Sequence, residues 1–420
     1  MTTGSQSRGT AYPYYVLGVL FAVSVFNFVD RQLVSVLLQP IKDEFQVSDA
    51  WMGALTGFAF MIVHSVFGIP LARWADRGDR RLILTLGLAV WSALTAVSGL
   101  ARHFAFLLFA RMGVGIGEAA GTPTAHSMIS DYFPPERRAT ALSVYAMGVY
   151  VGIMFGYIAA GWLGENLGWR MTFLVVGAPG LAIALLLYLT VDEPPRTTTV
   201  PSHPLGEVVR YLAAKPSYMI LLAAASFHAA AAYCIAQWAP TFLLRVHGMS
   251  LSEVGISLGL ATGLSGALGT LAGGTLSDRL ARVNRAWYAW TTAIAAFGSL
   301  PFAIGFVLSD SSFLALLWFA PMTFLTGMYI GPLYAMNQGL ARPRMRATAV
   351  AVHLFVVSIL GGGVGPWVVG LMNDAFQAEY GDAGIRQSLV WVQCVSLLAA
   401  GACYMLVART LDRDMQGAET

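Results

Sequence analysis

Charged residues are scarce in this chain. They make up only 11% of its 420 residues, whereas 57% of the residues are hydrophobic. Soluble proteins carry about 25% charged residues, so the composition excludes a water-soluble protein. The formal net charge of +3 is too small to indicate a nucleic-acid partner, and we expect none.

Cysteines and metal-ligand patterns are equally sparse. Cys234, Cys394 and Cys403 lie in apolar segments at spacings that fit neither a disulfide framework nor a metal site. The histidines of the apolar segments share no ligand spacing either, and they are His64, His126, His228 and His353. The sequence offers no nucleophile with a neighbouring base, no metal cluster and no soluble domain. We therefore predict neither an enzyme nor a resident metal or cofactor.

Long apolar runs, in contrast, recur along the whole chain. Each is long enough to cross about 30 Å of hydrocarbon as a helix. The runs cover approximately residues 14–41, 50–72, 82–101, 104–131, 139–164, 171–191, 218–244, 250–277, 286–308, 313–340, 347–373 and 387–408. The first run is too long, and too interrupted by charge, to be a cleaved signal peptide. The sequence thus predicts an all-α membrane protein with twelve transmembrane helices.

Basic residues predict the orientation of these helices. Eighteen of the 25 lysines and arginines fall on the side of the N-terminus, five on the opposite side and two within the apolar runs. Cytoplasmic loops carry an excess of Lys and Arg, so both termini are predicted to be cytoplasmic. We expect a multi-pass protein of the plasma membrane.

A segment rich in Pro, Thr and charge, residues 191–217, divides the runs into two sets of six. We interpret it as a cytoplasmic linker. It joins an N-terminal six-helix bundle, residues 1–190, to a C-terminal six-helix bundle with a short cytoplasmic tail, residues 218–420.

The two predicted bundles repeat one unit. RRATALSV at 137–144 is echoed by MRATAVAV at 345–352, 208 positions later. Other matched pairs are Gly156 with Gly365, Gly161 with Gly370, and Asp76 with Asp278. Parallel six-helix repeats related by an axis along the membrane normal are typical of rocker-type transporters, which bind substrate at the repeat interface. The duplication therefore predicts a transporter with pseudo-twofold symmetry.

Several motifs resemble those of the major facilitator superfamily, over essentially the whole chain. They are Asp76-Arg77 with Arg80-Arg81 in the loop after the second helix, Arg111 and Gly115 in the fourth helix, the glycines of the fifth helix, and GWRMTF at 168–173. The loop departs from the family pattern, because Ala72 replaces its first glycine and Asp79 follows an early Gly78. The resemblance implies the major facilitator fold.

Within that superfamily, the first half resembles the Spinster family. The segments that carry the resemblance are FNFVDRQ at 26–32, GVGIGEAAG at 113–121, DYFPPERRATALS at 131–143 and the GWRMTF segment. Spinster proteins export sphingolipids and lysophospholipids. The resemblance implies proton-linked or ion-sensitive export of amphipathic lipids.

Four full charges lie deep in the apolar runs, all in the first half: Asp30, Arg31, Arg111 and Glu118. Ionisable residues inside a membrane are costly and mark substrate or proton paths. The plainer alternative is a static salt bridge between the first and fourth helices.

Helix geometry predicts how these four charges pair. Adjacent residues on a helix do not face each other, so Asp30 and Arg31 need other partners. Arg111 and Glu118 are seven residues apart, about 10 Å along one face of their helix. We therefore expect Arg31 to approach Glu118, and Asp30 to approach Arg111 or solvent in a cavity.

Such a network has the properties of a proton switch. Burial favours the protonated form of a carboxyl group, whereas a neighbouring guanidinium favours the ionised form. We hypothesise that Asp30 or Glu118 exchanges a proton as the bundle rearranges. Arg31 and Arg111 are then either charge partners or ligands for a phosphate-bearing head group, which suits the guanidinium fork.

The second half has no charge of comparable depth, and its candidate cavity residues are aromatic or weakly polar. They are Tyr233, Trp238, Tyr329, Tyr334, Asn337 and Gln338. A cavity that is charged on one side and apolar on the other suits an amphipathic lipid. The alternative for these residues is ordinary packing between helices.

Matched loop charges predict a cytoplasmic gate between the two halves. Carboxylates at the ends of even-numbered helices can accept hydrogen bonds from helix N-termini and arginines of the opposite half. The candidates are Asp76, Arg77, Arg138, Asp278 and Arg346. Alternatively, they are solvated loop charges that follow the positive-inside rule.

The sequence as a whole favours a monomeric alternating-access secondary transporter. We expect it to export a lysophospholipid or sphingoid phosphate, with protons as the coupled or regulating ion. The first alternative is a proton-driven drug or organic-anion efflux transporter of the same superfamily. The second, from another class, is a membrane enzyme or lipid-binding protein without transport activity.

Overall fold

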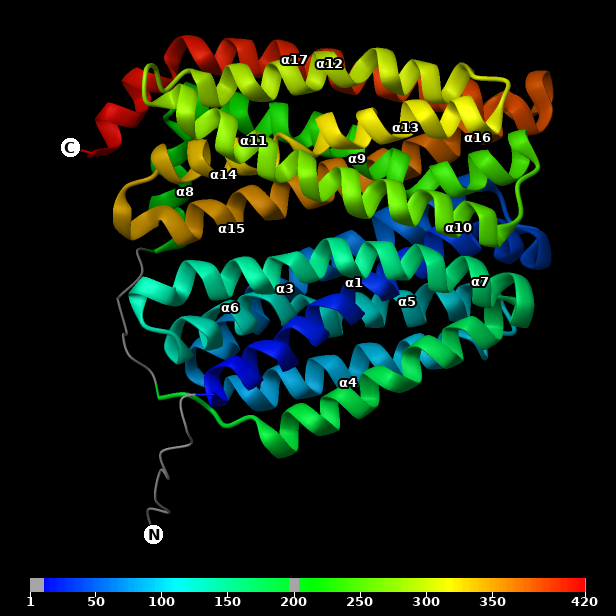
Figure 1. Cartoon of the computed structure of the whole chain (residues 1–420), viewed down its shortest axis with the longest axis horizontal. Helices are drawn as coiled ribbons and strands as arrows, with labels where there is room; N and C mark the ends of the chain where they lie inside the picture. The colour runs from blue at the N-terminus through cyan, green and yellow to red at the C-terminus, as the bar shows by residue number, and fades with distance from the viewer. Residues whose placement is uncertain (1–10, 196–203, 420) are drawn as a thin grey trace.

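The computed structural model describes residues 11–195 and 204–419, except for the side chains of residues 76, 418 and 419. Arg8, Arg196 and the linker residues 196–203 lie outside the described part of the chain. The described elements are all helical, and Figure 1 shows them as two bundles that lie side by side.

The N-terminal bundle contains six membrane-spanning helices. Its elements are α1 (Tyr12–Phe45), α2 (Asp49–Gly53), the π-helical η1 (Ala54–Phe58), α3 (Ala59–Arg77), α4 (Arg80–Ser98), α5 (Phe104–Ala119), α6 (Gly121–Tyr132) and α7 (Pro135–Thr190). Elements α2, η1 and α3 form one continuous span. Helix α7 contains two spans, because Gly168 reverses the chain with φ 76° and ψ 163°. Only glycine adopts such a conformation readily.

The C-terminal bundle repeats this plan. Its elements are α8 (Leu205–Ala213), α9 (Pro216–His247), α10 (Leu251–Leu260), η2 (Ala261–Ser265), α11 (Gly266–Ala281), α12 (Trp287–Leu308), α13 (Ser312–Gly327), α14 (Ile330–Gly339), η3 (Pro343–Met345), α15 (Arg346–Val357), η4 (Ser358–Val364), α16 (Gly365–Tyr380), η5 (Gly381–Ala383) and α17 (Gly384–Glu419). Gly381, with φ 55°, ends α16.

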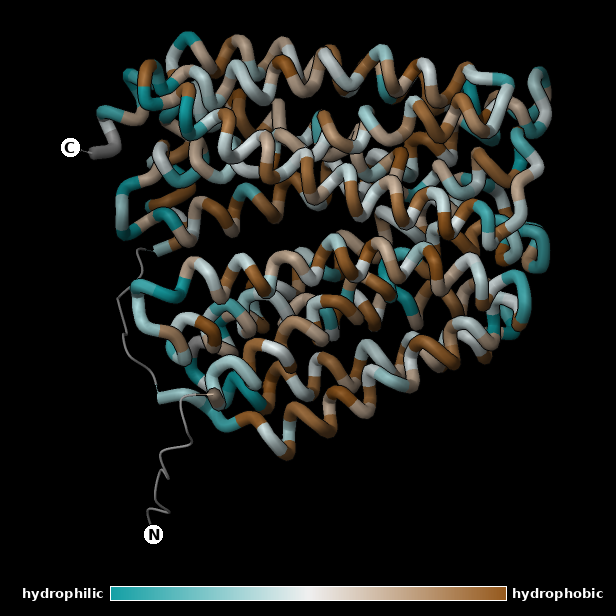
Figure 2. Tube along the Cα trace, viewed as in Figure 1, coloured by the Kyte–Doolittle hydropathy of each residue, from teal (hydrophilic) through white to brown (hydrophobic). Residues whose placement is uncertain are grey.

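Ten helical stretches of the described chain are long and apolar enough to cross a membrane. Two of them, Pro135–Thr190 and Pro343–Gly417, contain the chain reversals at Gly168 and Gly381 and therefore cross twice. The predicted set of twelve transmembrane helices is thus confirmed. Figure 2 shows hydrophilic residues gathered at the two ends of the helices, with hydrophobic residues between them.

Helix α1 begins and α17 ends at the same face of the molecule, here named the terminal face; the opposite one is the far face (Figure 1). At the far face the bundles touch, with α7 packed on α10 and α2 on α16. Towards the terminal face, α6 and α15 pack on helices of their own bundles. The two bundles are therefore closed against each other at the far face.

The internal repeat is visible in the backbone. Helices α1 and α9 both end at a left-handed residue, Gln46 with φ 52° and Gly248 with φ 61°, 202 positions apart. Helices α5 and α13 are both 16 residues long and lie 208 positions apart. These offsets relate equivalent positions in the two halves.

The linker contains a helix that its Pro-rich composition did not predict. Helix α8 buries Val208 and Leu212 against the C-terminal bundle. Glu193, just before the undescribed residues, binds the buried Arg80 at 2.7 Å. Both ends of the linker are thus attached to the bundle that they adjoin.

Candidate functional site

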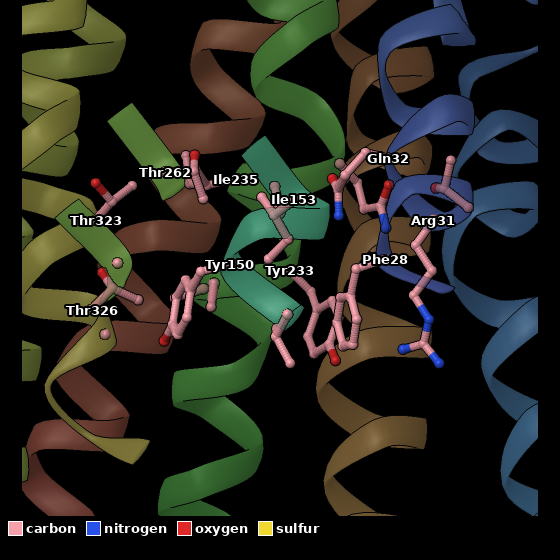
Figure 3. Close-up of a pocket in the computed structure, with 18 of the residues that line it drawn as sticks. Phe28, Arg31, Gln32, Tyr150, Ile153, Tyr233, Ile235, Thr262, Thr323 and Thr326 are labelled. Carbon is pink, nitrogen blue, oxygen red and sulfur yellow. The ribbon is translucent and has the colours of Figure 1, made fainter. Parts of the chain in front are cut away.

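A cavity of about 270 Å³ lies between the two bundles, and both of them line it. Figure 3 shows its two sides. Phe28 and Arg31, from α1, lie at one side, and Thr323 and Thr326, from α13, lie at the other. Tyr233 lies next to Phe28 in this view. The cavity therefore has one charged side and one side of hydroxyl and apolar groups.

Asp30 and Arg111 form a buried ion pair inside the N-terminal bundle. Arg111 donates from Nη2 to Asp30 Oδ2 at 2.7 Å and from Nη1 to Oδ1 at 3.1 Å. Thr95 donates a further hydrogen bond to Asp30. Both charged residues are only 3% exposed. The pair joins α1 to α5 and has its hydrogen-bonding groups largely satisfied.

Arg31 and Glu118 form a second pair at the cavity wall. Arg31 donates from Nε to Glu118 Oε2 at 2.7 Å, and its guanidinium lies 5.2 Å from the Phe28 ring centroid and 5.3 Å from that of Phe60. Glu118 is buried, and its Oε1 has no hydrogen-bond partner among the described residues. The Arg31 side chain is 19% exposed. Arg31 lines the cavity, as Arg111 of the first pair also does, so each pair presents one guanidinium to it.

The local sequence explains why the two pairs separate. Successive side chains on a helix diverge by about 100°, so the adjacent Asp30 and Arg31 point in different directions. Arg111 and Glu118, two turns apart, lie on one face of α5 and meet them at different heights. The pairing expected from the helix geometry is therefore present.

The predicted cavity residues of the C-terminal bundle divide into two groups. Tyr233 and Tyr329 line the cavity. Trp238 does not line it, because its indole is fully buried and donates to the Pro366 carbonyl oxygen at 2.9 Å. The remaining candidates also lie away from the cavity lining: Tyr334 half-buried, Asn337 buried and Gln338 exposed.

Several lining residues were not predicted from the sequence. They are Gln32, Thr56, Tyr150, Gln237, Thr262, Thr323, Thr326 and Gln393. One signal could have identified Thr326. Thr326 stands 208 positions after Glu118, which is the offset between α5 and α13. In the same way, Tyr233 stands 202 positions after Arg31, which is the offset between α1 and α9.

The predicted gate residues are spread over the terminal face. Asp278 accepts a hydrogen bond from Tyr288 of its own bundle at 3.1 Å. Arg77 and Arg346 are exposed and Arg138 is half-buried, while the side chain of Asp76 lies outside the described part. The described side chains of this set make no gate pair between the bundles in this conformation.

Two repeated six-helix bundles around a central cavity define an alternating-access transporter. Residues 20–366 match the family model described as Major Facilitator Superfamily. An MFS-type efflux pump of Mycolicibacterium smegmatis is 34% identical over 417 residues, covering 99% of this chain and 97% of the pump. A sphingosine-1-phosphate transporter of Danio rerio, SPNS2, is 28% identical over 453 residues, covering 96% of this chain and 86% of that protein.

A solved structure is also similar, that of a bacterial homolog of the human lysosomal transporter Spinster in an inward-facing, unoccupied conformation. It has a TM-score of 0.88 and 35% identity, and the match covers 97% of this chain and 99% of that one. The chain belongs to the major facilitator superfamily and, within it, to the group of Spinster homologues. It is a multi-pass membrane transporter and not an enzyme.

Within residues 11–195 and 204–419, no three His, Cys, Asp or Glu side chains come together as metal ligands would. The polar groups that line the cavity are the guanidinium groups of Arg31 and Arg111, the amides of Gln32, Gln237 and Gln393, and the hydroxyl groups of the lining threonines and tyrosines.

Proposed function

We propose that the protein exports amphipathic anionic lipids, lysophospholipids or sphingoid phosphates, and that transport is coupled to protonation of Glu118. We place it as a monomer in the plasma membrane, with the terminal face in the cytoplasm. The excess of Lys and Arg at that face supports the orientation. In this orientation the cavity lies between bundles that are closed towards the outside.

One observation carries the choice of substrate: charge lines only one side of the cavity. Arg31 uses Nε to bind Glu118, which leaves its two terminal nitrogens for a ligand. A guanidinium edge binds a phosphate oxygen pair well. The rings of Phe28 and Tyr233 beside it and the apolar lining suit a hydrocarbon chain.

The same pair supports proton coupling. A phosphate on Arg31 competes with Glu118 for the guanidinium, and a buried carboxylate that has lost its cation favours the protonated form. Protonation of Glu118 in turn frees Arg31. Lipid binding and proton binding therefore promote each other through one contact of 2.7 Å. Asp30 is the weaker candidate for the switch, because Arg111 and Thr95 already hold both of its oxygens.

A drug or organic-anion efflux activity is the second candidate. The similarity to an efflux pump of Mycolicibacterium smegmatis favours it, and a single guanidinium at the wall would also bind a carboxylate. The two proposals differ in what they require of the ligand. A lipid exporter needs a long hydrocarbon chain on the anion, whereas an organic-anion pump does not.

The test is counterflow in proteoliposomes. We would measure a lysophospholipid, a sphingoid phosphate and a short-chain organic anion, each with pH gradients of both signs. Wild type is compared with Glu118→Gln and with Glu136→Gln, an exposed acid at the start of α7. We expect lipid flux in wild type and Glu136→Gln to respond to the gradient.

In Glu118→Gln the gradient response should vanish, while equilibrium exchange continues, because glutamine mimics the protonated acid. An unchanged gradient response in Glu118→Gln would rule out this residue as the switch. Flux of the organic anion without flux of either lipid would favour the efflux alternative.

A further inference from the structure

The far face is held by two contacts that the internal repeat relates to each other. Asp374 in α16 accepts hydrogen bonds from the backbone nitrogens of Asp49 and Ala50, at 2.8 and 2.9 Å. Glu165 in α7 accepts one from the backbone nitrogen of Ser252 at 2.8 Å. Each acid thus caps the first turn of a helix in the opposite bundle, α2 or α10.

The sequence positions of these groups show that the two contacts are equivalent. Glu165 and Asp374 are 209 positions apart, and Ala50 and Ser252 are 202 apart. These are the offsets at which the two halves repeat along the helices concerned. The duplication therefore placed a carboxylate from each bundle on a helix N-terminus of the other.

Matched glycines bring the bundles close enough for this contact. A Cβ on Gly161 would overlap the carbonyl oxygen of Leu251, and a Cβ on Gly370 would overlap that of Asp49. Both glycines lie one helical turn before the capping acid. Close approach of the backbones is thus part of each contact, and any larger side chain would separate the bundles.

A cap that comes from the other bundle is sensitive to conformation. The first backbone N–H groups of a helix have no partner within it, and a carboxylate there satisfies them and interacts favourably with the helix dipole. When the far face opens, Glu165 and Asp374 must leave these groups. Each acid therefore stabilises the closed far face relative to the open one.

The two contacts differ in their surroundings. Beside Asp374, the buried Asp49 accepts from both Nη atoms of Arg245 at 2.5 and 2.8 Å, from Lys42 at 2.6 Å and from Asn373 at 3.0 Å. This network joins both bundles at a residue that is 1% exposed. Glu165 and Asp374 themselves are both exposed, so the difference lies in the buried ion pairs around Asp49.

Helices α2 and α10 also differ in the N-terminal capping that remains when the two bundles separate at the far face. Helix α10 has its own capping box, in which the Ser250 side chain accepts from the Glu253 backbone and the Glu253 side chain accepts from that of Ser250. The N-cap residue of α2, Ser48, makes no such side-chain bond. When Glu165 is lost, α10 keeps its own cap. When Asp374 is lost, the first backbone N–H groups of α2 have only water to bind.

We propose that Glu165 and Asp374 are paired latch residues that hold the far face closed, and that the Asp374 latch is the stronger, so that the seam between α7 and α10 separates first. This inference rests on alternating access alone. It requires neither a lipid substrate nor proton coupling.

The test measures opening of the far face in ligand-free protein. Spin labels are attached to cysteines at the exposed positions Asn166 and Asp382, one in each bundle, in a protein whose three native cysteines are replaced by serine. Distance distributions between the labels give the populations of closed and open states. The variants are Glu165→Ala and Asp374→Ala, with Asp310→Ala as a control at an exposed far-face acid.

We expect Asp374→Ala to raise the open-to-closed ratio about tenfold, as loss of a charged hydrogen-bonded contact implies. Glu165→Ala should raise it about threefold, because it loses one backbone hydrogen bond instead of two and α10 keeps its own capping box. Asp310→Ala should leave it unchanged. Asp374→Asn keeps an acceptor for the α2 backbone and should give an intermediate ratio.

If the open-to-closed ratio of both alanine variants equals that of the control, the latch proposal is wrong. A larger effect for Glu165→Ala than for Asp374→Ala would overturn the order of opening. If Asp374→Ala does not fold, Asp374→Asn decides, since a wild-type ratio in that variant also contradicts the proposal. Because no lipid is added, failure of the lipid-transport proposal leaves this result unaffected.

Discussion

Arg31 and Tyr233 stand at matched positions on the first helix of each half, and both line the cavity. Glu118 and Thr326 are matched on the fourth helix. The first half fills these positions with an ion pair, whereas the second has a phenol and a hydroxyl that donates to the Met322 carbonyl at 2.7 Å. One backbone plan therefore presents charge on one side of the cavity only.

A third matched pair of lining residues, Arg111 and Phe319, shows the same difference. Arg111, matched by Phe319, needs Asp30 as a buried counter-ion, and Thr95 completes that network. Phe319 needs only apolar neighbours, such as Phe306 at a centroid distance of 5.1 Å. The ion pairs beside the cavity are thus confined to one bundle.

The comparison is most strongly tested at the matched pair Arg111 and Phe319. Arg111→Met leaves Asp30 buried without its cation, so we expect a loss of roughly 3–5 kcal/mol in the free energy of unfolding. Phe319→Met, at the equivalent position, should cost less than about 1.5 kcal/mol. Thermal denaturation in detergent measures both.

The double variant Asp30→Asn with Arg111→Met is the control for the ion pair. Removing both charges should recover part of the loss, because no unpaired ion remains. Equal destabilisation by the two single methionine variants would mean that charge is not what distinguishes the halves.

A second prediction adds charge to the half that has none. Thr326→Glu places an anion on the wall opposite Arg31, and repulsion should raise the KM for an anionic lipid about tenfold. Thr326→Val removes the hydroxyl without adding charge and should stay close to wild type. Adding Tyr233→Arg to Thr326→Glu should recover much of the lost affinity. Counterflow in proteoliposomes measures all three, and an unchanged KM in Thr326→Glu would place the head group elsewhere.

The sequence predicted the charged wall because charge in an apolar run is a strong local signal. Four residues in the first half had to find partners, and helix geometry predicted Glu118 for Arg31 and either Arg111 or solvent for Asp30. The hydroxyl wall gave no such signal. Thr323 and Thr326 bond to carbonyls of their own helix, so their sequence pattern is that of any threonine in a helix.

The prediction that Trp238 lines the cavity was wrong because the sequence does not specify how a buried helix is rotated about its axis. Helix α9, which contains Trp238, is buried on several sides, so its apolar pattern does not reveal which face meets the cavity. Glu165 and Asp374 were overlooked because they fall between predicted runs, although the structure places them in helices α7 and α16. Extending the glycine repeat by a few residues would have found them as a matched pair.

A third prediction separates packing from substrate contact at Trp238. Trp238→Phe loses the hydrogen bond to Pro366, so we expect a loss of about 1 kcal/mol in the free energy of unfolding. The KM should not change, because the side chain does not reach the cavity. Tyr233→Phe is the comparison at a lining position, where the reverse pattern is expected. Melting temperature and counterflow, measured on the same preparations, test this division, and a raised KM in Trp238→Phe would contradict it.

The smallest expected effect concerns Thr262 on the hydroxyl wall. Its Oγ1 is buried and has no hydrogen-bond partner among the described residues, yet the residue lines the cavity. Thr262→Val keeps the shape of the side chain and removes the unpaired hydroxyl, so the free energy of unfolding should stay the same or rise slightly.

If the Thr262 hydroxyl binds a polar group of the substrate, the KM of Thr262→Val should rise about two- to threefold, as loss of one neutral hydrogen bond implies. Thr275→Val is the control, since that hydroxyl already donates to the Leu271 carbonyl at 2.8 Å and the residue does not line the cavity. A wild-type KM in Thr262→Val would show that this hydroxyl does not contact the substrate.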